Sequence, residues 1–194
     1  GVDEIISEFR EKNLRYVTLG ICSERQKDNY VEVDQSSGSF LATKYLLSLG
    51  HRQIGLINKP RSFFMYNRND LLNGYRSALE EAGLNYNPNL IREGNFNFED
   101  GYANLRSLLE ENPDLTGVIC ASDPMAYGAI RAIEDLGFSA GKDIDVIAGD
   151  NLPLTRKLYP YLSALSNPSY EQGKQAGKML LSIITQKKDM PGIT

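Results

Sequence analysis

The feature that most constrains this 194-residue chain is the regular alternation of short apolar runs with longer stretches of helical period. Residues 54–57, 118–121 and 146–149 form apolar runs with the length of buried strands. Between these runs, as along 71–82 and 126–136, apolar side chains recur every three or four residues, which is typical of helices that bury one face. The alternation favours an α/β fold with doubly wound, mostly parallel sheets and helices on both faces.

Local signals indicate where the expected helices begin. Asn97, with Asp100 three residues later, and Asp123, followed by a proline, are typical of helix N-caps. Ser36 or Ser37 is expected to cap an earlier helix. The apolar stripe of that earlier helix consists of Leu41, Ala42, Tyr45, Leu46 and Leu49.

Composition and charge limit the functional classes. The formal net charge is −4 and the densest basic run is Lys187–Lys188, so this part of the protein is not expected to bind DNA. The distant cysteines, Cys22 and Cys120, and a single histidine predict no metal, no cofactor and a reducing, cytoplasmic setting. No apolar run reaches the roughly 18 residues of a membrane span, and the N-terminus lacks signal-peptide features, so export is not expected.

Polar and aromatic side chains follow the expected strands. Ligands of open α/β sheets bind outside the carboxyl ends of the strands, so these positions are candidates for a binding rim. They are Asn58, Arg61, Phe63, Tyr66 and Arg68 after the run at 54–57, Asn95 and Phe96 after a weaker strand that begins at Leu90–Ile91, Ser122 and Asp123 after the run at 118–121, and Asp150 and Asn151 after the run at 146–149. Amides, carboxylates and arginines match the hydroxyl groups of a polyhydroxylated ligand, and the Phe96 ring can cover a sugar face or stack on a base.

Several of these residues also have a purely structural interpretation. Asp123 is mainly a helix cap, with binding as a secondary role. Asp150 and Asn151 are either a turn or part of the rim. Phe96 either packs in the core or stacks on a ligand.

Catalysis is the weaker interpretation of these residues. His51 lies between a helix stop and a strand, which places it at the amino edge of the sheet, opposite the rim. The chain has no GxSxG elbow, no GxxxxGK[ST] phosphate loop and no GxGxxG after a strand. The acid pairs at 80–81 and 110–111 are expected on solvated helix faces. We therefore expect a binding protein with no catalytic residue, with an α/β enzyme as the minor alternative.

Four segments carry a resemblance to a known family. Residues 33–54 contain Asp34, a helix and Gly-His-Arg before a strand, and 74–79, 122–128 and 149–151 follow in order. Together they resemble the effector-binding core of LacI/GalR transcription regulators, a family that shares its fold with periplasmic sugar-binding proteins. The resemblance implies a two-lobed clamp, dimeric when complete, in which an effector bound between the lobes shifts the equilibrium between DNA-competent and DNA-incompetent states.

The resemblance also implies residue roles. Asp150 is similar to the effector-contacting aspartate, Phe96 to the aromatic wall, and Ser122 to the polar residue before the helix; Asp34 lies near the lobe crossing. Leu71 stands where the family usually places an effector-binding arginine, three residues before Gly-Tyr. Arg68 or Arg61 is a candidate substitute. A sugar is the preferred effector, with purines and other small polar molecules as alternatives.

The same resemblance gives the domain organisation. Residues 1–32 are expected to belong to an incomplete N-terminal lobe, 33–150 to the C-terminal lobe, 151–159 to the lobe crossing and 160–194 to the return into the N-terminal lobe. The DNA-binding headpiece of the family is absent from this sequence, so operator DNA would be bound by a missing segment. The alternative function is that of a periplasmic sugar-binding protein in a transport system.

Overall fold

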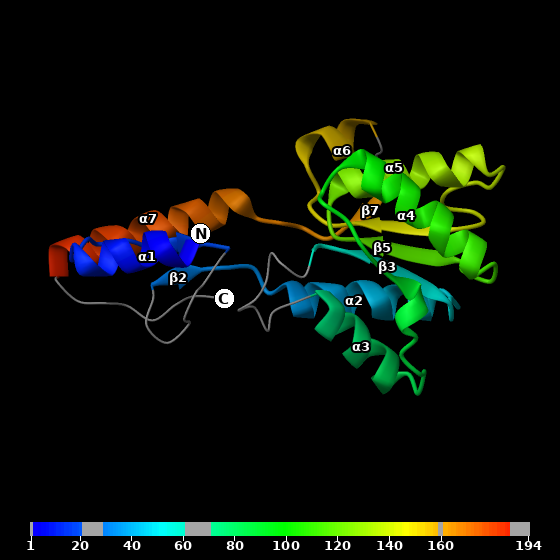
Figure 1. Ribbon diagram of the computed structural model, residues 1–194, viewed down its shortest axis with the longest axis horizontal. Coiled ribbons are helices and arrows are strands. Elements are labelled where there is room, and N and C mark those ends of the chain that lie inside the picture. Colours follow the sequence, from blue (N-terminus) through cyan, green and yellow to red (C-terminus); the bar gives the residue numbers. More distant parts are fainter. Residues whose placement is uncertain (1, 21–28, 61–70, 159–160, 187–194) are drawn as a thin grey trace. The chain divides into compact units, whose positions relative to one another are not determined.

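The computed structural model describes residues 2–20, 29–60, 71–158 and 161–186 (Figure 1). The chain divides into two compact units. The smaller unit is built mainly from Gly1–Asp34 and Pro168–Thr194, and the larger from Gln35–Met65 and Asn69–Asn167. Each unit is a separate α/β assembly, and the chain passes from one to the other and back.

The larger unit contains a five-stranded sheet in the order β4-β3-β5-β6-β7. Its strands are β3 (Ile54–Asn58), β4 (Ile91–Glu93), β5 (Gly117–Cys120), β6 (Asp145–Ala148) and β7 (Ser163–Ala164). Every neighbouring pair is parallel, and Leu56, Ile119 and Ile147 lie in register across β3, β5 and β6. The predicted α/β fold with parallel sheets is confirmed.

Helices cover both faces of this sheet (Figure 1). The helices α2 (Gln35–Ser48) and α3 (Leu71–Glu81) pack on one face, against Leu56, Ile119 and Ile147. The helices α4 (Phe98–Glu111) and α5 (Asp123–Asp135) pack on the other, against Val118 and Cys120. Alternate strand residues therefore feed two separate apolar layers, because successive side chains point to opposite faces of a strand.

The helices α4 and α5 approach each other through glycines. A Cβ atom at Gly101 would lie 2.1 Å from the carbonyl oxygen of Met125, and one at Gly128 would lie 2.0 Å from that of Phe98. Both distances are far below van der Waals contact, so only glycine fits at these crossings. The contact fixes the positions of the N-termini of both helices, which border the carboxyl end of the sheet.

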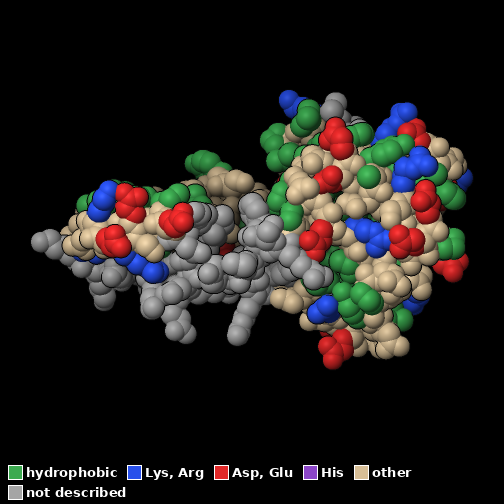
Figure 2. All heavy atoms as spheres, in the orientation of Figure 1, with side chains coloured by type: hydrophobic (Ala, Val, Ile, Leu, Met, Phe, Trp, Pro, Cys, Tyr) green, Lys and Arg blue, Asp and Glu red, His purple; other side chains and the backbone are tan. Residues whose placement is uncertain are grey.

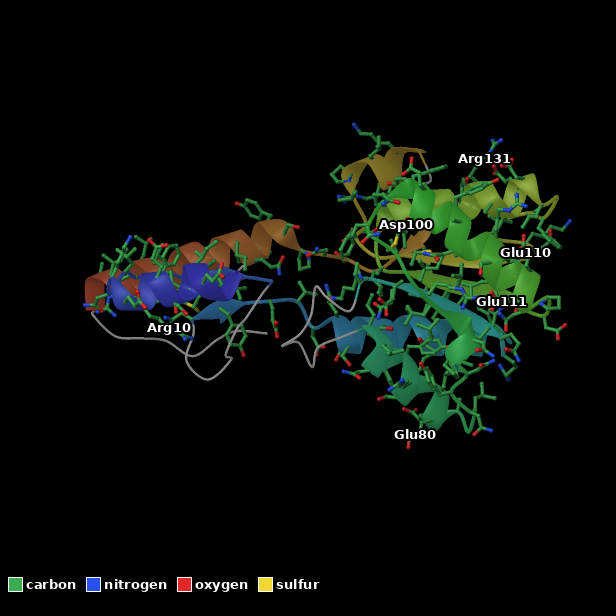
Figure 3. All side chains as sticks on the ribbon, viewed as in Figure 1. Arg10, Glu80, Asp100, Glu110, Glu111 and Arg131 are labelled. Atoms are coloured by element: carbon green, nitrogen blue, oxygen red, sulfur yellow. The ribbon has the colours of Figure 1, made fainter. Side chains whose placement is uncertain are left out.

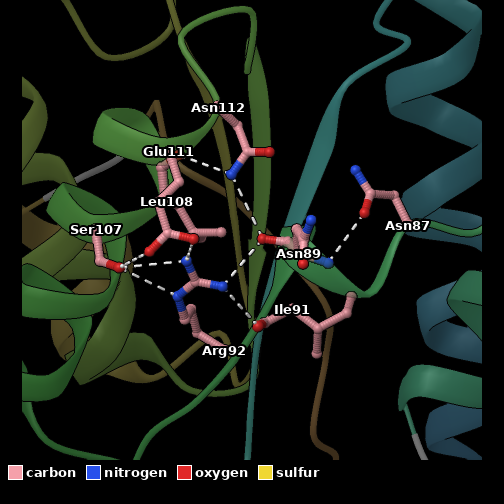
Figure 4. A network of polar contacts seen from close by, with 8 residues as sticks. All are labelled: Asn87, Asn89, Ile91, Arg92, Ser107, Leu108, Glu111 and Asn112. Atoms are coloured by element: carbon pink, nitrogen blue, oxygen red, sulfur yellow. Dashed lines mark hydrogen bonds and ion pairs between the residues drawn. The ribbon is translucent and has the colours of Figure 1, made fainter.

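The edge strand β4 is fixed to the C-terminal end of α4 by a polar network around Arg92 (Figure 4). The guanidinium donates to Ser107 Oγ at 3.2 Å and to the Asn89 carbonyl oxygen at 3.0 Å, and it pairs with Glu111 at 2.7 Å. Asn112 also donates to the Asn89 carbonyl oxygen, at 3.4 Å. Because β4 leads directly to Phe96, this network also helps to position one side of the rim.

The smaller unit contains α1 (Val2–Glu11), the parallel strand pair β1 (Thr18–Leu19) and β2 (Tyr30–Val31), and α7 (Ser169–Gln186). The long helix α7 packs against both strands. Within the described ranges its core is small, and consists of Val31, Ala176, Met179 and Ile183, with Val17 packed against them. Its two strands have two residues each, which is too short to show a hydrophobic period.

The predicted lobe crossing at 151–159 is wrong. This segment contains α6 (Pro153–Leu158) and belongs to the larger unit, as does β7, which pairs with β6. The chain leaves the larger unit after Asn167, and the first boundary falls after Asp34 rather than at 33. The error has a physical cause, because a six-residue helix and a two-residue strand are too short to show hydrophobic periodicity.

The first helix of the larger unit also differs from its predicted stripe. It begins at Gln35, and Ala42 and Leu46 are buried as expected. Leu41, Tyr45 and Leu49 are instead more than half exposed, and the small polar residue Ser39 is buried. The predicted face was therefore too wide on one side.

Acidic and basic side chains are interspersed over the face of the larger unit drawn in Figure 2. The mixture agrees with the small net charge of −4. In the described part of the chain, no helix is both long and apolar enough to cross a membrane.

Candidate functional site

The order of the sheet reverses direction at β3, which has β4 on one side and β5 on the other. Ligands of doubly wound folds bind at the carboxyl ends of the strands beside such a switch point. Asn58 ends β3, and Lys59 follows it with 4% of its surface exposed. Lys59 donates a hydrogen bond from Nζ to Gln35. The sequence prediction included Asn58 but missed Lys59, a buried cation directly after a strand.

Ser122 follows β5 and is the N-cap of α5. Its hydroxyl accepts a hydrogen bond from the backbone N–H of Met125 at 3.4 Å, and its backbone is extended. The prediction that Asp123 is the N-cap is therefore wrong by one residue, because Asp123 is already the first residue of the helix. Ser122 is 3% exposed at the carboxyl end of the central strand.

The Asp123 carboxylate is fully buried. Its hydrogen bonds go to the loop after β6 and to α6. Oδ1 accepts hydrogen bonds from the backbone N–H groups of Asp150, at 2.8 Å, and Asn151, at 3.1 Å. Oδ2 accepts from the backbone N–H of Leu152, at 2.7 Å, and from the hydroxyl of Thr155. A carboxylate with four donors satisfies the otherwise unpaired N–H groups that lead into α6.

Asp150 lies two residues after the end of β6 and is partly buried. Its Oδ2 accepts from the backbone N–H of Asp123 at 3.3 Å, so the two aspartates bind each other's backbone. Burial raises the pKa of Asp150, and the Asp123 charge adds to this effect, while hydrogen bonds from the Asp123 backbone and the Asn167 side chain oppose it. The next residue, Asn151, has a left-handed backbone with φ of 56°. The carboxylate is thus held at the rim by a rigid turn.

Phe96 lies in the segment after β4 with φ of 63°, a conformation that is strained for an aromatic residue. Its side chain is half-buried and packs against the apolar layer under α4 and α5. The turn is held by Asp100, whose Oδ2 accepts from the backbone N–H of Asn95 at 2.6 Å. Asn97 caps α4, as predicted, by accepting from the Asp100 N–H at 2.7 Å. Backbone strain concentrates at functional sites, so this outlier supports a role for Phe96 at the rim.

The carboxyl group of Asp100 is stabilised in its ionised form by this turn. The backbone N–H of Asn95 contributes most to lowering its pKa, and the side chains of Asn95 and Asn97 add to the effect. Figure 3 shows Asp100 at the N-terminal end of α4, with Glu110 and Glu111 at the other end. The two glutamates therefore lie away from the rim, as predicted.

Three predicted site residues, Asp34, Arg61 and Arg68, stay predictions. Asp34 is exposed and is the last residue of the smaller unit before α2 begins. Arg61 and Arg68 lie outside the described residues, as do Phe63 and Tyr66. Leu71, where the resemblance would place an arginine, is 4% exposed and packs in the apolar layer of α2 and α3.

His51 lies at the amino edge of the sheet, as predicted. Nδ1 is 2.9 Å from Thr116 Oγ1 and Nε2 is 2.8 Å from Asp145 Oδ2, and these two partners stand at the starts of β5 and β6. Among the described residues, no three His, Cys, Asp or Glu side chains come together to hold a metal ion. Burial raises the pKa of the Cys120 thiol, so its reactive thiolate is disfavoured.

The larger unit is a doubly wound α/β assembly with buried polar groups at its carboxyl rim, and the chain passes twice between the two units. These two features are typical of the class of two-lobed ligand-binding proteins. Residues 43–193 match the model of the periplasmic binding protein-like domain. The chain belongs to this family, in the form found in LacI-family transcription regulators.

Individual relatives agree with this assignment. The chain is 38% identical over 163 residues to the ribose operon repressor of Haemophilus influenzae, covering 84% of this chain and 48% of the repressor. It superposes on a LacI-family regulatory protein from Chloroflexus aggregans with a TM-score of 0.87 at 28% identity, covering 97% of this chain and 67% of that one.

A second solved structure carries a ligand. A LacI-family regulator from Enterococcus faecium with bound ribose matches with a TM-score of 0.86 at 26% identity, covering 100% of this chain and 71% of the other. Among the curated relatives, the chain spans about half of each relative's length.

Proposed function

We propose that this chain is part of the effector-sensing core of a LacI-type transcriptional regulator. A small polar effector binds at the carboxyl rim of the larger unit and modulates the binding of operator DNA by a segment outside this sequence. The observation that carries the proposal is the rim itself. A partly buried carboxylate, Asp150, is fixed after β6, Ser122 caps the neighbouring helix, and Phe96, with its strained backbone, follows β4.

The chemistry of these groups favours a polyhydroxylated effector. A carboxylate accepts hydrogen bonds from two adjacent hydroxyls, and an aromatic ring covers the apolar face of a sugar. Asn151 can add an amide donor from the turn after Asp150. Arg61 or Arg68 is the proposed replacement for the arginine missing at Leu71, and Asp34 is a further candidate effector contact. A sugar is the preferred effector, with purines as the alternative class.

The remaining parts of the proposal concern the whole protein. The relatives are transcription regulators, which favours binding over catalysis and a cytoplasmic setting over the periplasmic transport alternative. We infer that the complete protein is a homodimer that binds operator DNA. In the full-length protein, a helix-turn-helix segment ahead of this sequence would support regulation, whereas a signal peptide would support transport.

Isothermal titration calorimetry against a panel of pentoses, hexoses, disaccharides and purine bases tests the binding site. The parent chain should bind at least one of these compounds reversibly and without turnover. A compound that binds the native state should also raise the thermal unfolding midpoint in proportion to its affinity. Turnover of a bound compound would instead support an enzyme.

Matched variants test the residues. Asp150→Asn should weaken binding at least about tenfold, because a charged acceptor is lost, and Phe96→Ala should weaken it similarly. Asp114→Asn is the control, since Asp114 is an exposed aspartate in the turn between α4 and β5. The site assignment fails if Asp150→Asn and Phe96→Ala bind the compound as tightly as the Asp114→Asn control.

A further inference from the structure

We propose that Asp123 is a positioning residue, which does not touch the effector but holds Asp150 in the orientation that binds it. This inference rests on the proposed function, because it assigns a role in the same rim. It differs from the role expected from the sequence, where Asp123 was both a helix cap and a secondary effector contact.

The Asp123 carboxylate is enclosed and fully hydrogen-bonded. The Asp123 side chain has no exposed surface, and each of its carboxylate oxygens already accepts two hydrogen bonds. A bound molecule would have to break at least one of these bonds to reach it. Breaking a buried hydrogen bond to a charged group is costly, so a direct contact is disfavoured.

Asp123 and Asp150 each bind the backbone of the other. Asp123 accepts from the backbone of Asp150, and Asp150 accepts from the backbone of Asp123. The two turns, one after β5 and one after β6, are therefore joined by a pair of bonds that fixes both the backbone and the carboxylate of Asp150. A side chain held in this way loses little freedom when it binds a ligand, which is the general advantage of preorganisation.

The support of Asp123 extends into α6. Thr155 is 1% exposed, and its hydroxyl donates its only hydrogen to Asp123 Oδ2. The hydroxyl of Tyr127 also contacts Thr155 Oγ1, so Tyr127 is the donor in that pair. A chain of hydrogen bonds thus runs from Tyr127 through Thr155 to Asp123, and from there to the turn that carries Asp150.

The carboxylates of Asp123 and Asp150 lie close together, so the pKa of Asp150 depends on the charge of Asp123. The charged group that faces Asp150 from α5 is Asp123, and the neutral side chain of Asn167 faces it from the segment after β7. Because the Asp123 charge raises the pKa of Asp150, removal of that charge should lower it. The titration reports that the two carboxylates are close, and the amide resonances of residues 150–152 report whether Asp123 holds the turn, because their N–H groups donate to its carboxylate.

Asp123→Asn is the principal variant, studied by carboxyl-carbon and amide NMR of the ligand-free chain. Asparagine offers one acceptor oxygen in place of two, so part of the turn loses its partner. We expect the titration midpoint of Asp150 to move to lower pH and the amide resonances of residues 150–152 to shift. Unchanged titration and unchanged amide resonances would overturn the proposal, whether or not any effector is found.

Thr155→Val and Thr155→Ser form a matched pair in case Asp123→Asn does not fold. Valine removes the hydroxyl at nearly constant volume, whereas serine keeps it. The amide resonances of residues 150–152 should shift in Thr155→Val and return toward their parental positions in Thr155→Ser. Equal resonances in the two variants would count against the proposal.

Calorimetry with D-ribose separates this inference from the proposed function. If the parent chain binds ribose, Asp123→Asn should weaken binding about tenfold together with the NMR changes. Weaker binding without any NMR change in the ligand-free chain would show direct contact and overturn the positioning role. If no compound in the sugar and purine panel binds, the proposed function fails, and the NMR comparison still decides whether Asp123 holds Asp150.

Discussion

Replacement of Gly128 by alanine should destabilise the larger unit, although alanine is the better helix former. Gly128 lies in the middle of α5, where the added Cβ would be 2.0 Å from the carbonyl oxygen of Phe98 and 2.7 Å from the backbone nitrogen of Tyr102. Both neighbours are backbone atoms of α4, so no side-chain rotation can relieve the overlap. The two helices must therefore separate by roughly 1 Å or more to restore van der Waals contact.

Two opposing effects decide the magnitude. Alanine in place of glycine in a helix interior contributes about 1 kcal/mol of stability. Overpacking of a close-packed interior costs about 1–3 kcal/mol, and more where backbone must move. The overlap at Gly128 involves backbone alone, so we expect the upper part of that range and a net loss of about 2 kcal/mol. For a domain of this size, the loss corresponds to a decrease of about 6–10 °C in the unfolding midpoint.

Urea and thermal unfolding followed by circular dichroism measure this change. Gly38→Ala is the matched control, because Gly38 also lies in a helix of the larger unit and its added Cβ would be 3.7 Å from a methyl carbon of Leu165. That control should be neutral or stabilised by up to about 1 kcal/mol. If Gly128→Ala unfolds at the same urea concentration as Gly38→Ala, the close helix crossing does not constrain the fold as argued.

Three further predictions follow from the same structure. Because burial raises the pKa of Asp150, the parent chain should lose stability relative to Asp150→Asn as the pH rises from about 4 through the folded-state pKa; parallel thermal midpoints across that range would contradict this. His51→Ala should cost about 1–3 kcal/mol in urea unfolding through loss of its bonds to Thr116 and Asp145, and should leave ribose affinity unchanged; a folded variant of parental stability would exclude a structural role. In hydrogen exchange, the amides of β3 and β5 should be protected at least about 100-fold more than those of α1, since these strands are fully buried and α1 is mostly exposed; equal protection would refute the argument.

Much of the larger unit could be predicted from the sequence because its central strands are buried on both faces. The runs at 54–57, 118–121 and 146–149 are continuous apolar segments, and each coincides with a strand of the sheet. Asn97 was identified as a cap because its partner is three residues away. In these cases the residues that determine the element are close together in the sequence, and the prediction holds.

The elements that were missed depend on contacts distant in sequence. The strand β7 joins the larger sheet by pairing with β6, and nothing within its two residues indicates this partner. The short helix α6 is held from outside by Asp123, which precedes Leu152 and Thr155 by about thirty residues. Sequence reasoning therefore assigned this segment to a crossing between lobes, and placed the boundary too early.

The candidate site shows the same division. Carboxylates after strands could be predicted as rim residues, since the carboxyl ends of parallel strands share one edge. The different surroundings of the two aspartates could not, because Asp123 and Asp150 have the same chemistry and similar positions in the pattern. Their difference is one of burial, which leaves Asp150 partly accessible and encloses Asp123 completely. The sequence therefore predicts where acidic groups gather, and the three-dimensional contacts decide which of them is open to a ligand and which is enclosed.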